Sequence, residues 1–146
     1  MSDAVGRVLY VAEPPALWRL RPPVVVDCSV LAALLFAETN ADEAAALLAG
    51  KLAHAPTLLP FEMTNVARSK LRAGAQSEAV LAALQDFDDQ RIELHAVPPV
   101  TLLGLATQYQ LSAYDAAYLW LAGDLAAPLA TFDRRLAQAA HQHLGR

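Results

Sequence analysis

The segment Val24-Val25-Val26-Asp27-Cys28-Ser29-Val30-Leu31 decides the fold class of this chain. Its three consecutive valines have the composition of a short strand that is buried on both faces, which is typical of a parallel sheet. The strand ends at Asp27, and Ser29 opens an apolar stretch through Ala37 that favours a helix. A buried strand followed at once by a helix is the pattern with which an α/β domain begins.

The rest of the chain continues this alternation of short strands and helices. We predict further strands at 52–55, 91–97 and 129–132, and helices at 39–50, 58–73, 77–88, 98–109, 112–122 and 133–141. Ser77 is expected to cap its helix, and Thr39 or Asn40 to cap the helix at 39–50. Such alternation predicts an α/β fold with three layers, α/β/α, in which helices flank a small parallel sheet.

Residues 1–23 differ from the remainder, because they contain four prolines and no sustained periodic pattern. We expect them to form a loosely held N-terminal arm with a short strand at Val8–Val11. Residues 24–146 are expected to form one compact domain. The length of 146 residues and the 55% hydrophobic content suit a single domain with a real core.

The cellular setting is predicted from what the sequence lacks. Cys28 is the single cysteine, which excludes an intramolecular disulfide and a multi-cysteine zinc site. The first residues show no secretory signal, and no apolar run is long enough to span a bilayer. We therefore expect a cytoplasmic protein that makes no membrane contact.

Four carboxylates occupy informative positions. Asp27 follows the first predicted strand, and Asp133 follows the last. Glu62 lies in the first turn of one predicted helix, and Asp115 lies at the start of another. Because ligands of open parallel α/β sheets bind beyond the carboxyl ends of the strands, we expect all four side chains to face one crevice.

Carboxylates that gather without a counter-charge repel one another. A Mg²⁺ or Mn²⁺ ion prefers oxygen ligands and removes this repulsion. Such an ion also lowers the pKa of bound water and stabilises charge on a phosphoryl oxygen, which is what a metal-dependent nuclease requires. The net charge of −4 counts against nucleic acid, but without these four acids the chain holds equal numbers of acidic and basic residues.

The segments around the four acids resemble the PIN-domain ribonucleases of the VapC type, the toxin half of bacterial toxin–antitoxin pairs. They occur in the family's order and read VVVDCSVL (24–31), FEMTNVA (61–67), SAYDAAYL (112–119) and APLATFDRRL (127–136). The resemblance covers Val24 to about Ala140. It implies a PIN-like sheet, metal-dependent endoribonuclease activity, an RNA substrate, a homodimer, and inhibition by a small antitoxin protein. An Arg or Lys of that antitoxin would enter the acidic crevice.

The same resemblance implies roles for individual residues. The metal-binding and catalytic acids would be Asp27, Glu62, Asp115 and Asp133. Glu38 matches a recurrent acid that follows the first helix. The residues that steady ligands or waters beside the metal would be Ser29, Asn65 and Thr131.

Basic side chains follow two of the acids on the same predicted helices. We consider them candidates for binding RNA phosphates, with an ordinary amphipathic helix surface as the alternative. They are Arg68, Lys70, Arg72, Arg134 and Arg135.

Simpler structural roles compete with these functional ones. Asp115 and Asp133 stand where N-caps would stand, and Glu62 could merely complement a helix dipole. Cys28 should alternate to the strand face opposite Asp27 and act as a small core residue, and Tyr118 is also assigned to the core or an interface. The four histidines appear scattered, and we predict no zinc site among them: His54, His95, His141 and His143.

Other functions remain open at the level of sequence. A catalytically inactive PIN-fold binding module, acting through a protein partner, is the main alternative. Two other phosphotransfer domains are disfavoured. A receiver domain would need paired acids before its phosphate-accepting Asp and a late lysine, and a haloacid-type phosphatase would need Asp where Ser29 stands. The family also begins closer to its first strand and often ends in a strand, whereas residues 141–146 show no strand pattern.

Overall fold

The computed structural model describes residues 21–145. The strand predicted at Val8–Val11, and the arm as a whole up to residue 20, lie outside the described residues. The end of the predicted arm does fall within them, and there Pro23 already belongs to the first strand, one residue earlier than expected.

A four-stranded parallel sheet forms the middle layer, with the strand order β3-β2-β1-β4. Val24, Val25 and Val26 of the central strand β1 are each no more than 1% exposed, because helices cover both faces. The predicted parallel α/β class is therefore confirmed. The strands are β1 (Pro23–Val26), β2 (Leu52–Pro56), β3 (Glu93–His95) and β4 (Leu129–Ala130).

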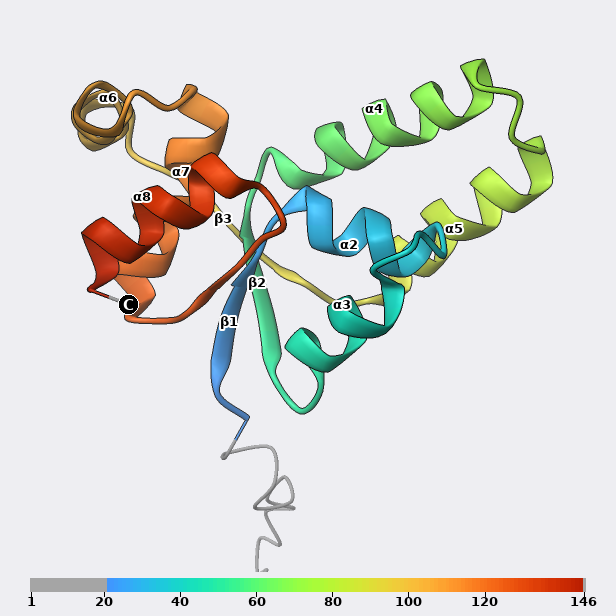
Figure 1. Cartoon of the computed structure of the whole chain (residues 1–146), viewed down its shortest axis with the longest axis horizontal. Coiled ribbons are helices and arrows are strands. Elements are labelled where there is room, and N and C mark those ends of the chain that lie inside the picture. The colour runs from blue at the N-terminus through green and yellow to red at the C-terminus, as the bar shows by residue number, and fades with distance from the viewer. Residues whose placement is uncertain (1–20, 146) are drawn as a thin grey trace, which may run out of the picture.

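Seven helices are described around this sheet. Figure 1 shows α2 to α5 on one side of the strands and α6 to α8 on the other, which gives the three predicted layers. No helix within residues 21–145 combines the length and apolar character that a membrane span needs. The helices are α2 (Cys28–Leu35), α3 (Ala41–Leu48), α4 (Leu59–Arg72), α5 (Ser77–Asp89), α6 (Pro99–Tyr109), α7 (Ala113–Leu125) and α8 (Arg134–Leu144).

Helix α7 carries the core on its side of the sheet. It packs against β1, β2 and β4, and α6 and α8 pack against it in turn. Its small side chains let the helix lie close to the strands, while Tyr118 and Leu119 fill the remaining space. Its buried residues are Ala116, Ala117, Tyr118, Leu119, Leu121 and Ala122.

Helix α4 has a narrower buried face. Leu59, Met63 and Ala67 recur at intervals of four and are buried, so they form one stripe along the helix. Glu62 lies in the first turn of α4, between Leu59 and Met63 in the sequence, and shortly after β2 ends at Pro56. The packing of α4 therefore holds Glu62 near the carboxyl end of the sheet.

Two strands are shorter than predicted, and local hydrogen bonding and backbone geometry explain why. Arg91 has a φ of +52°, which interrupts extended backbone before Glu93. Beyond Ala130, the Phe132 N–H donates to the Ser29 hydroxyl at 2.9 Å and not to a neighbouring strand. The predicted strands at 91–97 and 129–132 thus shrink to three and two residues.

Three predicted helix starts also need correction. Helix α2 begins at Cys28, not Ser29, because Asp27 serves as its N-cap. Helix α5 includes Ser77 as its first residue and not as its cap. Gln76 stands at the N-cap position, and its side chain forms no capping hydrogen bond. Asn40 stands at the N-cap position of α3 but its side chain forms no capping hydrogen bond.

Candidate active site

Asp27 lies where β1 meets α2 and is only 6% exposed. Its backbone N–H donates to the Ala130 carbonyl at 3.2 Å, which extends the pairing of β1 with β4 by one residue. Its Oδ1 accepts the Val30 N–H at 3.2 Å and so caps α2. Sheet pairing and helix capping together fix the position of this carboxylate.

Two hydroxyls complete the contacts of the Asp27 side chain. Ser29 Oγ donates to Oδ1 at 2.6 Å, and Thr131 Oγ1 donates to Oδ2. Each hydroxyl also accepts a backbone N–H from the turn after β4, Ser29 from Phe132 and Thr131 from Asp133, both at 2.9 Å. Ser29 and Thr131, two of the three residues predicted to steady the site, therefore tie Asp27 to the start of α8.

The Asp27 carboxylate accepts four hydrogen bonds. Ser29 Oγ and the Val30 N–H donate to Oδ1, Thr131 Oγ1 donates to Oδ2, and the Ser29 backbone N–H is a further donor. These contacts lower the pKa of Asp27 against the larger effect of burial and fix the orientation of the carboxylate.

Glu62 is held by a partner that the sequence interpretation assigned to the core. The buried Tyr118 hydroxyl donates to Glu62 Oε1 at 2.6 Å across the space between α7 and α4. Tyr118 lies three residues after Asp115, so both occupy one face of α7. That spacing is the signal by which Tyr118 could have been recognised as a site residue.

The other two acids stand at helix starts in different ways. Ser112 is the N-cap of α7, and its Oγ accepts the Asp115 N–H at 3.1 Å, so capping does not account for Asp115. Asp133 is the N-cap of α8, and its Oδ1 accepts the Leu136 N–H at 2.9 Å. Asp133 therefore has a structural role whatever else it binds.

The carboxylates of the site influence one another electrostatically. Burial raises the pKa of Asp27, Glu62 and Asp115 above the ordinary value of each. The negative charges of Asp115 and Asp27 raise the pKa of Glu62 further, and Asp133 does the same to Asp115. At Asp27, hydrogen bonds from Ser29 and Thr131 lower the pKa and so oppose the effect of burial. The four predicted acids thus form one connected electrostatic group.

Cys28 lies beside this group, so its predicted place on the opposite strand face is wrong. It is the first residue of a helix, and strand alternation does not apply to it. Burial raises the pKa of its thiol to about 12, and the charges of Glu62, Asp27 and Glu38 add to the effect. The thiol stays protonated and contacts Met63 Sδ at 3.6 Å, in keeping with a packing role.

The basic residues differ in how they are engaged. Arg135 donates to the Gln110 carbonyl at 2.9 Å, and its charge lowers the pKa of Asp115 against the larger effect of burial. Lys70 forms an ion pair with Glu38 at 2.7 Å. Arg68, Arg72 and Arg134 are exposed.

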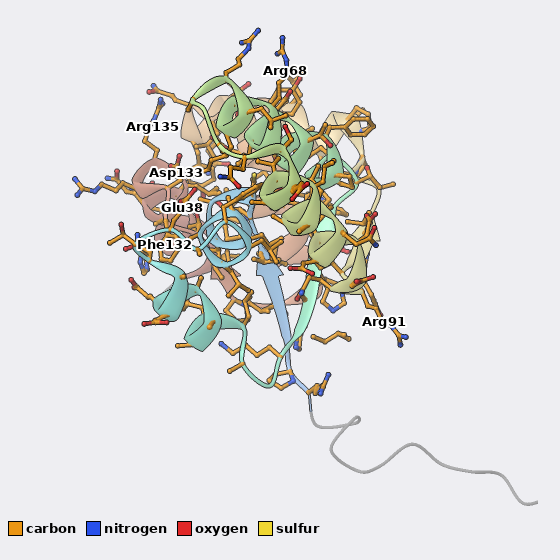
Figure 2. The ribbon with its side chains drawn as sticks, turned by 90° about the vertical axis from the view of Figure 1, so that its right-hand side faces the viewer. Glu38, Arg68, Arg91, Phe132, Asp133 and Arg135 are labelled. Atoms are coloured by element: carbon orange, nitrogen blue, oxygen red, sulfur yellow. The ribbon has the colours of Figure 1, made fainter. Side chains whose placement is uncertain are left out.

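The exposed cations are not spread evenly around the molecule. Figure 2 shows Arg68, Arg135 and Asp133 at the end towards which β1 points, with Arg91 well away from them. Asn65 and Lys70 also line a shallow groove that follows α4 from Glu62 and is closed on one side by Cys28. Polar and basic groups therefore surround the carboxylates.

The acidic group is open and not a closed cage. No three of these four carboxylates, all within residues 21–145, bring their oxygens within 4.8 Å of one another. The donor set is nevertheless all oxygen, which suits Mg²⁺ or Mn²⁺. Because Mg²⁺ keeps several of its own waters, it can be held by one or two carboxylates directly and by the others through water.

Comparison with known proteins agrees with this architecture. The family model described as "PIN domain" matches residues 24–142. A protein named Ribonuclease VapC3 from Pyrobaculum aerophilum is 29% identical over 121 residues, which cover 79% of this chain and 92% of that protein.

The fold also resembles a solved structure. The crystal structure of PAE2754 from Pyrobaculum aerophilum superposes with a TM-score of 0.66 at 24% identity, covering 86% of this chain and 88% of the other. This similarity concerns the fold alone. Because the family model spans most of the sequence and the fold agrees, the chain belongs to the PIN domain family.

Proposed function

We propose that this protein is a metal-dependent endoribonuclease, the toxin of a toxin–antitoxin pair, and that it cleaves RNA phosphodiester bonds at the four-carboxylate site. The observation that carries the proposal is the fixed and buried Asp27 carboxylate, which lies in one electrostatic group with three other acids. The similarity to a protein named Ribonuclease VapC3 supports the choice of RNA.

The acids Asp27, Glu62, Asp115 and Asp133 would hold one or two Mg²⁺ or Mn²⁺ ions. Burial raises the pKa of Asp27, Glu62 and Asp115, and repulsion by neighbouring acids raises the pKa of Glu62 and Asp115 further, as expected where carboxylates gather without enough counter-charge. When bound, the ion supplies an activated water and stabilises charge on the phosphoryl group.

The residues of the chain itself orient these groups. Ser29 and Thr131 orient the Asp27 carboxylate, and Tyr118 holds Glu62 through Oε1. Arg135 offsets part of the negative charge around Asp115 and is exposed to an incoming phosphate. Chemistry at this site needs no Cys, Ser or His nucleophile.

The substrate would be single-stranded or looped RNA in the cytoplasm. Unstacked RNA can present its backbone to an open site, whereas a duplex hides its bases. Arg68, Arg72 and Arg134 are exposed and would contact phosphates, as would Lys70 along the groove of α4. Asn65 lines the same groove beside Glu62 and would steady a ligand or water there. Lys70 would then exchange its partner Glu38 for a phosphate.

A small antitoxin protein and a second copy of the chain are the proposed protein partners. An antitoxin Arg or Lys entering between the carboxylates would meet unbalanced negative charge. Large apolar side chains stay exposed on the described surface, with Val100 at 87% and Leu103 at 70%, and these would be covered in a homodimer.

The activity test uses purified full-length protein and a pool of bacterial RNAs. We expect cleavage with Mg²⁺ or Mn²⁺ and none with EDTA. Asp27→Asn and Asp115→Asn should each lower the rate by about a hundredfold or more, the scale on which single electrostatic groups act in catalysis. Asp124→Asn, an exposed acid near the other end of α7, should retain wild-type cleavage.

Several outcomes of this test are decisive. Metal-dependent cutting that survives in Asp27→Asn would contradict the assigned site. No cutting by partner-free, metal-replete protein would favour the inactive binding module. A copurified small protein whose removal restores cleavage would support the antitoxin proposal.

Thermal unfolding tests the electrostatic argument separately from activity. In EDTA, Asp115→Asn should raise Tm by roughly 2–5 °C, because it removes a half-buried charge that Asp133 repels. Mn²⁺ should raise the Tm of the wild type and have a smaller effect on Asp115→Asn. A variant that is less stable than wild type in EDTA, with an unchanged response to Mn²⁺, would contradict this account.

RNA binding by the exposed cations is tested by kinetics. Arg68→Gln and Arg134→Gln should each raise KM severalfold at unchanged kcat. Each should also reduce the salt dependence of binding by about 0.7 in the log–log slope, the contribution of one phosphate contact on a single strand. Arg91→Gln, whose side chain lies away from the site, is the matched control. Equal effects of all three substitutions would show general charge attraction and not specific contacts.

A further inference from the structure

A second group of ionisable side chains lies on the sheet, formed by His54 of β2 with Glu93 and His95 of β3. The sequence interpretation treated these histidines as scattered, and for this pair it is wrong. The parallel register aligns His54 with Glu93 and Pro56 with His95. Because alternate residues of a strand face the same way, Glu93 and His95 share the sheet face of His54.

The donor atoms of the three side chains converge. His54 Nδ1 lies 2.9 Å from His95 Nε2 and 3.5 Å from Glu93 Oε2. One donor atom from each side chain lies within 4.8 Å of the other two. A tetrahedral ion bound at ~2.0–2.1 Å keeps its ligand atoms about 3.3 Å apart. The distance from His54 to His95 is somewhat shorter than this value, and the distance from His54 to Glu93 is somewhat longer.

The surroundings suit an ion that enters from solvent. His54 is 7% exposed and forms the floor of the cluster, His95 is half-buried, and Glu93 is exposed. Burial lowers the pKa of His54, so its ring is neutral near pH 7 and keeps a lone pair. In the cluster as described, a hydrogen bond between His54 Nδ1 and His95 Nε2 links β2 to β3. A cation bound to both nitrogens could replace the proton of that hydrogen bond.

This cluster is electrostatically separate from the carboxylate site. The charges that act on His54 are those of Glu93 and His95. The charges that act on Glu62 and Asp115 come from the acids of their own group and from Arg135. The donor chemistry also differs, since two imidazoles and one carboxylate favour zinc-like ions, whereas an all-oxygen set favours Mg²⁺.

We propose that His54, Glu93 and His95 form a second metal site, which binds a divalent transition cation of the zinc type and clips the edge strand β3 to β2. Strand β3 has three residues and, within residues 21–145, pairs with β2 alone, so few backbone hydrogen bonds of the described sheet hold it. A cation shared by both strands adds a link between them, and an ion that binds only the folded chain stabilises it by mass action.

The binding experiment uses the full chain and Zn²⁺ as the probe, in competition with a chromophoric chelator and with excess Mg²⁺ present. Wild-type protein should bind one Zn²⁺ that Mg²⁺ does not displace. Glu93→Gln and His95→Gln should each weaken this binding by about tenfold or more, the usual cost of a lost ligand or ligand partner. His141→Gln removes an exposed histidine on α8 and should leave binding unchanged.

Two further measurements separate this site from the carboxylates and from misfolding. Asp27→Asn should bind Zn²⁺ as the wild type does, even if the proposed nuclease activity is absent from every variant. Zn²⁺ should raise the Tm of wild type by several degrees and have little effect on His95→Gln, and in EDTA Glu93→Gln should melt as wild type does. Unchanged Zn²⁺ affinity in both cluster variants, displacement by Mg²⁺, or loss of binding in Asp27→Asn would overturn the proposal.

Discussion

The carboxylate of Asp27 joins the two ends of the described domain. It follows the central strand β1, caps α2, and receives the hydroxyl of Thr131, which lies 104 residues away in the sequence. Burying a carboxylate is costly, and its raised pKa records that cost. Hydrogen bonds to its side chain from Ser29, Val30 and Thr131, together with the β1–β4 backbone pairing, offset this cost and fix the group in one orientation.

The remaining acids lie in one electrostatic group with Asp27, and their burial and repulsion lower the stability of the folded chain. Glu62 and Asp115 have raised pKa values for which burial is the main cause and neighbouring acids a further one. A sequence selected for stability alone would place other side chains at these buried, mutually repelling positions. Strain of this kind is typical of functional sites, and a divalent cation is the simplest group that relieves it.

Much of the fold could be predicted because its signals are local. The three valines of β1 and the alternation of strands and helices predicted the parallel sheet, and the acids stand out because they follow strands or begin helices. The ends of β3 and β4 could not be predicted in the same way. They depend on the positive φ of Arg91 and on a hydrogen bond from Phe132 to Ser29, 103 residues apart.

Contacts between distant segments explain two side-chain pairs that could not be predicted from the sequence. Tyr118 reaches Glu62 across 56 residues, and His54 meets His95 across 41. Neither contact follows from periodicity, because the first needs the packing of α7 near α4 and the second needs the register of β2 with β3. The individual roles assigned to the four acids and to the basic residues remain predictions.

The most direct test of the central claim is a crystal structure of the protein with Mn²⁺, read from the anomalous scattering of the ion. We predict an anomalous peak at coordination distance from the Asp27 carboxylate, with the remaining acids reaching the ion directly or through water. Absence of a peak beside Asp27 at saturating Mn²⁺, in crystals where this site is open to solvent, would contradict it.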